Sequence, residues 1–81
     1  MSYFVLKEVA ADGEKVRRGP FSTENEARMV LANEVEEAFA SDSSLARRDV
    51  QAEVDEAVRL GSKEITDATG TVVFSFSIEQ E

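Results

Sequence analysis

Two pairs of adjacent carboxylates, Glu36-Glu37 and Asp55-Glu56, are the residues of this chain with the most evident potential for chemistry. Paired acids can act as general acid and base, or they can hold a divalent cation. Both pairs fall in segments with a helical pattern, where neighbouring side chains diverge by about 100°. They cannot converge on one reacting atom, so a solvated helix face is the simpler interpretation.

Nucleophilic and metal chemistry has little support elsewhere in the chain. Without His or Cys, the Ser and Thr hydroxyls have no imidazole to activate them, and no thiolate metal site can form. The segment Asp67-Ala68-Thr69-Gly70 lacks the alternating oxygen ligands and final Glu of an EF-hand loop, and we interpret it as a turn. We therefore expect no enzyme activity, no catalytic or metal-binding residue and no cofactor.

Acidic residues gather near the end of the first predicted helix. Glu34, Glu36 and Glu37 have no basic residue three or four positions downstream. Exposed acids at a helix C-terminus oppose the helix dipole, at a cost of about 0.3–1 kcal/mol each. On a helical wheel Met29 falls on the outer side with Glu36, so a flexible apolar residue accompanies the acids. Such a strip suits a basic partner.

The residues that we predict to contact this partner lie on or beside the exposed faces of two predicted helices. They are Met29, Glu34, Glu36, Glu37, Asp49, Glu53 and Glu56. Reversal of Glu36 and Glu37 to Lys is expected to abolish binding without unfolding the domain.

Four segments have strand patterns. Residues 3–10 are rich in aromatic and branched side chains, and Asp12-Gly13 is a hairpin signal that predicts a second strand over about residues 14–18, ended by Gly19-Pro20. Two further strands are expected at about residues 63–66 and 71–79. The last one alternates apolar with small or polar side chains, which predicts one buried and one largely solvated face.

Two helices are predicted between the strand pairs. The first begins near Thr23, where Glu26 three residues later completes a capping box, and it ends at residues 41–44. The second runs from about Ser44 to Leu60, with Gly61 as a left-handed C-cap. In both segments apolar residues recur at intervals of three and four, which gives each helix one buried stripe.

The order ββααββ predicts a single α+β domain over residues 1–81, with a four-stranded antiparallel sheet and two helices packed on one face. The long first and last strands are expected to lie together in the centre of the sheet. The short second strand then forms an edge, where its basic residues Lys15, Arg17 and Arg18 discourage edge-to-edge pairing.

The charge of the chain limits its partners. The formal net charge is -8, and because residues 1–20 are slightly basic the remainder carries -9. Direct nucleic-acid binding needs a basic face, so we expect none, and no apolar run is long enough to span a membrane. The lack of cysteine suits a reducing compartment, and we expect a cytoplasmic monomer or homodimer.

The segment from Gly19 to Arg28, GPFSTENEAR, resembles the strand-to-helix junction of SPOR peptidoglycan-binding domains. That family has the element order βαββαβ, whereas the order predicted here is ββααββ. We therefore interpret the resemblance, which covers about ten residues, as convergent capping chemistry.

The favoured hypothesis is a small acidic protein-binding module without catalysis. A sharper form is an inhibitor whose carboxylates imitate phosphates and occupy a basic nucleic-acid-binding complex. In size, acidity and lack of cysteine the chain is similar to phage-encoded anti-CRISPR proteins, although no motif is shared. The alternatives are a structural domain of an acidic or salt-adapted proteome, whose charge serves solubility alone, and a small hydrolase or metal-binding domain.

Overall fold

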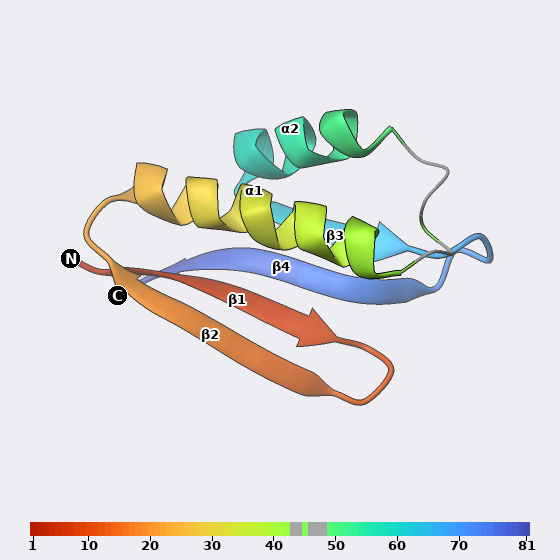
Figure 1. Cartoon of the computed structure of the whole chain (residues 1–81). Helices are drawn as coiled ribbons and strands as arrows, with labels where there is room; N and C mark the ends of the chain where they lie inside the picture. Colours follow the sequence, from red (N-terminus) through yellow and green to blue (C-terminus); the bar gives the residue numbers. More distant parts are fainter. Residues whose placement is uncertain (43–44, 46–48) are drawn as a thin grey trace.

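The computed structural model describes residues 1–42, 45 and 49–81, and in this part of the chain two helices cover one face of a four-stranded antiparallel sheet (Figure 1). The predicted α+β fold and its ββααββ order are confirmed. The elements are β1 (Tyr3–Val9), β2 (Glu14–Phe21), α1 (Glu24–Ser41), α2 (Val50–Leu60), β3 (Ser62–Thr66) and β4 (Val72–Gln80).

The sheet has the strand order β2-β1-β4-β3, so the first and last strands lie in its centre as predicted. Val5 lies opposite Ile78 and Val9 opposite Phe74, so apolar side chains meet across the two central strands. The chain ends also meet, because Ser2 and Glu81 exchange two backbone hydrogen bonds of 2.9 and 2.8 Å. These bonds continue the pairing of β1 and β4 by one residue on each strand.

Strand β2 is longer than the sequence pattern indicated. The prediction that Gly19-Pro20 ends it is wrong, since β2 continues to Phe21. Proline lacks a backbone donor, but an edge strand tolerates it because one side of the strand has no neighbour to bond. The register shifts from Val5 opposite Arg18 to Tyr3 opposite Phe21, so β2 carries one extra residue here.

Helix α1 begins where its capping signal predicted. Thr23 is the N-cap, and its hydroxyl oxygen accepts a hydrogen bond of 3.2 Å from the backbone N–H of Glu26. The carboxylate of Glu26 accepts a hydrogen bond of 2.9 Å from the hydroxyl of Ser22 rather than from the backbone N–H of Thr23, so the second hydrogen bond of the predicted capping box is replaced. The helix ends at Ser41, within the predicted range.

Helix α2 begins at Val50, so the predicted start near Ser44 is wrong; residues 43–44 and 46–48 lie outside the described residues. Asp49 caps α2, because its side chain accepts a hydrogen bond of 3.1 Å from the backbone N–H of Ala52. Gly61 ends the helix at φ 71°, which confirms the predicted left-handed cap.

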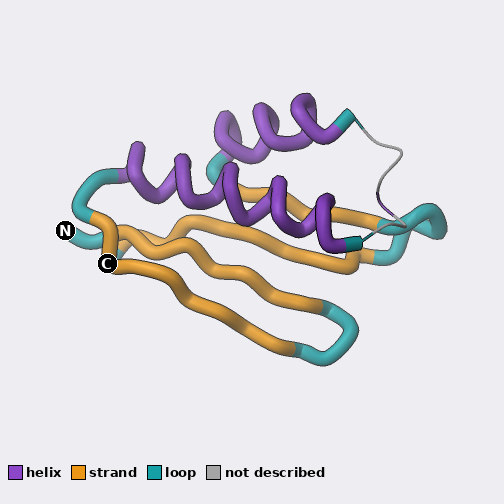
Figure 2. The backbone as a smooth tube through the Cα atoms, in the orientation of Figure 1, coloured by secondary structure: helices purple, strands orange, loops and turns teal. Residues whose placement is uncertain are grey.

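The core lies between the helices and the inner face of the sheet, and Figure 2 shows both helices on that side. Val5, Ile65 and Phe76 enter it from the sheet, and the buried residues of the helices and their connection are Ala27, Leu31, Val35, Ala38, Phe39, Leu45, Val54 and Ala57. Side chains alternate along each strand, so the residues between the core positions point to the opposite face.

Candidate protein-binding site

The outward side of α1 carries a strip of five exposed residues, which we call the α1 strip: Met29, Asn33, Glu36, Glu37 and Ala40. The last four line a shallow hollow of about 310 Å³. Met29 is 64% exposed, so an apolar side chain lies in solvent on the same strip. The structure therefore brings together three of the predicted contact residues, Met29, Glu36 and Glu37.

The carboxylates of Glu36 and Glu37 have no intramolecular counter-charge in the part of the chain that the structure describes. No basic residue lies in the last turn of α1, and neither acid forms an ion pair or hydrogen bond with a described residue. Their charges lie near the negative end of the helix dipole. The local arrangement thus leaves two negative charges available to an external cation.

The prediction that Glu34 lies on the exposed face of α1 is wrong. Glu34 is only 7% exposed, and it forms an ion pair with the Arg18 guanidinium of β2. Its second oxygen, Oε2, is buried without a hydrogen-bond partner among the described residues. The spacing contained the signal, because Glu34 follows buried Leu31 by three residues and precedes buried Ala38 by four.

Glu53 and Glu56 lie on α2, and both form ion pairs within the chain. Lys63 of β3 forms ion pairs with both, and its Nζ lies 3.1 Å from Oε1 of Glu56. Burial lowers the pKa of Lys63, but the hydrogen bonds and charges of Glu53 and Glu56 outweigh it, so the pKa is raised above its ordinary value. The alternation with buried Ile65 places Lys63 on the inner face, a signal that could have revealed this pairing.

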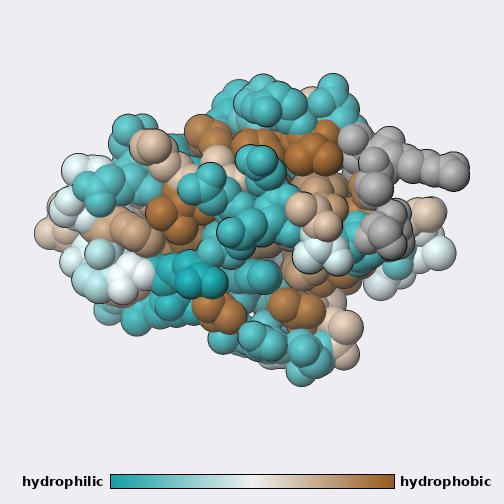
Figure 3. Space-filling model, in the orientation of Figure 1, coloured by the Kyte–Doolittle hydropathy of each residue, from teal (hydrophilic) through white to brown (hydrophobic). Residues whose placement is uncertain are grey.

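Asp49, the remaining predicted contact residue, is exposed and acts as the N-cap of α2. Figure 3 shows hydrophilic residues over the outer side of α2 at the top of the molecule. Three of the six predicted acids, Glu34, Glu53 and Glu56, are thus engaged in ion pairs within the chain. Glu36 and Glu37 are adjacent predicted acids, and neither has an ion-pair partner among the described residues.

The raised pKa of Lys63 predicts a pH dependence of stability. A raised folded-state pKa contributes stability that is fully present below the pKa of an unfolded lysine, about 10.4, and that is lost as the pH rises through the folded value. The free energy of unfolding should therefore fall more between about pH 9 and about pH 12 in the natural protein than in Lys63→Met. Urea unfolding at several pH values measures this difference.

The exposed Lys15 provides the matched control for this experiment, since it forms no ion pair with a described residue. Lys15→Met should retain the alkaline loss of the natural protein. The same pH dependence in Lys63→Met and the natural protein would contradict the assigned cause.

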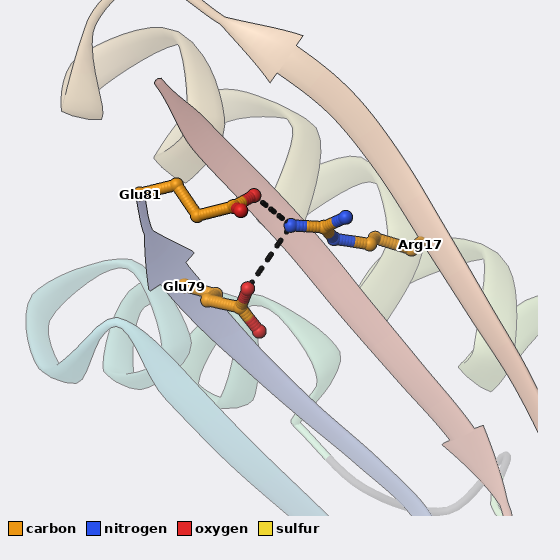
Figure 4. A network of polar contacts seen from close by, with 3 residues as sticks. All are labelled: Arg17, Glu79 and Glu81. Carbon is orange, nitrogen blue, oxygen red and sulfur yellow. Dashed lines mark hydrogen bonds and ion pairs between the residues drawn. The ribbon is translucent and has the colours of Figure 1, made fainter. Parts of the chain in front are cut away.

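Arg17, which was not among the predicted site residues, forms two ion pairs on the face of the sheet that lies away from the helices. Figure 4 shows its guanidinium between Glu79 and Glu81, and the distance to Oε1 of Glu79 is 3.0 Å. The same guanidinium lies 3.6 Å from the ring centroid of Phe4. These groups link β2 to β1 and to the end of the chain, so their role is structural.

Within the described residues, no three His, Cys, Asp or Glu side chains are grouped so that they could hold a metal ion. In the same residues no helix combines the length and the apolar character needed to cross a membrane.

In comparisons with known proteins, no family model, no curated sequence and no solved structure matches this chain. The fold defines its class as a small α+β domain, and the properties of the site derive from this chain's own residues.

Proposed function

We propose that this protein is a non-catalytic protein-binding module whose α1 strip binds a basic surface of a partner. The observation that supports this function is the pair Glu36 and Glu37, which has no counter-charge in the part of the chain that the structure describes. Glu34 and Glu24, by contrast, have counter-charges within the chain, which are Arg18 and Arg28. A helix selected for stability alone would carry basic residues in its last turn, and α1 carries none.

The chemistry of the α1 strip specifies the kind of partner. Two adjacent carboxylates attract lysine or arginine side chains, and electrostatic complementarity of this kind raises the association rate and selects the partner. Exposed Met29 adds a flexible apolar contact that adapts to a neighbouring surface. A basic protein segment with an apolar side chain beside its charges fits both features.

Imitation of nucleic-acid charge is the sharper form of this proposal. It requires carboxylates that are free to replace phosphates, and on the helices Glu36 and Glu37 meet that requirement. Competition by duplex DNA for the captured partner tests this form separately. The cytoplasmic setting also belongs to the proposal, and the cysteine-free composition supports it.

Charge reversal of the α1 strip is the direct test. Glu36→Lys with Glu37→Lys is expected to weaken partner binding on the order of a hundredfold, because both reversals replace attraction with repulsion. Capture from host lysate with each variant as bait, washed at low and high salt, identifies proteins that depend on the strip. Titration of the purified partner then measures the change in Kd.

Glu14→Lys with Asp55→Lys is the matched control, because both residues are exposed and the net charge changes equally. A true partner binds the natural protein and this control, is lost with the strip variant, and dissociates in salt. If capture is equal for all three baits at physiological salt, the acidic-strip function is wrong and the charge serves solubility.

A further inference from the structure

The face of the sheet opposite the helices is open in the described part of the chain (Figure 2). Because Val5 and Phe76 point into the core, strand alternation places Leu6 and Ser75 on this open face. A hollow of about 410 Å³ lies here, and its lining includes Leu6, Arg17 and Ser75. Leu6 is only partly buried, so the hollow offers apolar surface to a partner.

One row of side chains across the open face carries opposite charges at its two ends. The strand registers align four residues from the β2 edge to the β3 edge, in the order Lys15, Glu8, Ser75 and Glu64. Lys15 and Glu64 are both exposed. Neither forms an ion pair or a side-chain hydrogen bond with any described residue. The open face therefore has Lys15 at one edge and Glu64 at the other, and in the described part of the chain neither charge has an ion-pair partner.

We propose that the open face binds a second copy of this chain, related by a two-fold axis that runs parallel to the strands between β1 and β4. This axis places β2 of each copy over β3 of the other, so Lys15 faces the partner's Glu64 twice in the dimer. Stacked sheets lie about 10 Å apart, which extended Lys and Glu side chains can span from both sides. A two-fold axis perpendicular to the strands would instead place β2 over β2 and β3 over β3, so edges of like charge would face each other.

The size of the open face sets the strength of this dimer. Four strands about 4.8 Å apart, each contributing roughly seven residues of about 3.3 Å, give a footprint on the order of 400 Å² per copy. A standard interface buries about 800 Å² per partner, so we expect a weak dimer that forms at micromolar concentrations and above. Because α1 lies on the other face, dimerisation leaves the α1 strip accessible.

Sedimentation equilibrium of the full chain from about 1 μM to about 1 mM tests the dimer, since this range brackets a Kd of tens of micromolar. The mean mass should rise from one chain towards two. Lys15→Glu and Glu64→Lys should each weaken dimerisation about tenfold, because each creates two like-charge contacts. The double variant exchanges the charges and should recover the natural Kd to within about threefold.

Asp55→Lys is the matched control, because it makes the same charge change as Glu64→Lys at an exposed position of α2, on the helical side of the molecule, and it should leave the dimer unchanged. Circular dichroism confirms that each variant is folded. A natural protein that stays monomeric at about 1 mM overturns the proposal. A double variant as weak as the single ones also overturns it. Neither result bears on partner binding by the α1 strip.

Discussion

Replacing Gly19 with alanine is expected to lower the free energy of unfolding by about 4 kcal/mol. Gly19 has φ +133°, a backbone conformation that side chains with a Cβ rarely adopt. A Cβ at this position would lie 2.8 Å from the backbone oxygen of Tyr3 and 3.0 Å from Cδ1 of Phe4. Tyr3 belongs to the central strand β1, so its backbone cannot move without disturbing the sheet.

Such a loss is large for a domain of this size, whose whole stability is roughly 4–12 kcal/mol at about 0.05–0.15 kcal/mol per residue. Urea unfolding monitored by circular dichroism measures it. Gly13→Ala is the matched control, because Gly13 has φ +70° but a Cβ added there would have no atom within 4 Å. It should cost about 1 kcal/mol, from backbone conformation alone. Equal losses at the two positions would show that the close approach to β1 contributes nothing.

Replacing Arg18 with alanine is expected to lower the free energy of unfolding by about 3 kcal/mol, since it leaves a buried carboxylate without its counter-charge. Glu34 has an 8% exposed side chain, and one of its oxygens already lacks a partner among the described residues. The Arg18 side chain is 52% exposed. Water near it reduces the loss, so the expected value lies at the low end for a broken buried pair.

A double-mutant cycle separates the ion pair from other effects of removing Arg18. Glu34→Met removes the buried charge and keeps the side-chain volume, so its own effect should lie within about 1 kcal/mol of zero or stabilise the domain. Arg18→Ala in the Glu34→Met background should then cost about 1 kcal/mol or less. If Arg18→Ala costs the same in both backgrounds, the two residues are not coupled.

Glu34 and Glu36 are acids of the same helix, but Glu34 is buried and Glu36 is exposed, so they have different roles. They are two positions apart, so their side chains leave α1 about 200° apart. Glu34 points towards β2 and forms an ion pair with Arg18. Glu36 points away from the sheet and forms no ion pair with a described residue. A substitution at Glu34 therefore reports on stability, and one at Glu36 reports on binding.

Much of the fold could be predicted because its signals are local. Asp12-Gly13 can form a tight turn wherever two strands flank it, Thr23 caps the N–H of a residue three positions ahead, and Gly61 adopts the left-handed conformation that ends a helix. The alternation in β4 depends only on the period of a strand. The start of α2 was harder to predict, since Ser44 and Asp49 are both good caps and local chemistry does not choose between them.

The order of the elements, the caps Thr23 and Gly61 and the apolar faces could be predicted from the sequence, because each depends on residues a few positions apart. Which charges are neutralised by ion pairs within the molecule depends on the three-dimensional arrangement of the elements. Arg17 and Glu79 are 62 positions apart, and they meet only because β1 brings β2 and β4 to its two sides. Ion pairs between distant residues follow from packing, so the assembled sheet and helices were needed to show that Glu34 is paired while Glu36 and Glu37 have no counter-charge among the described residues.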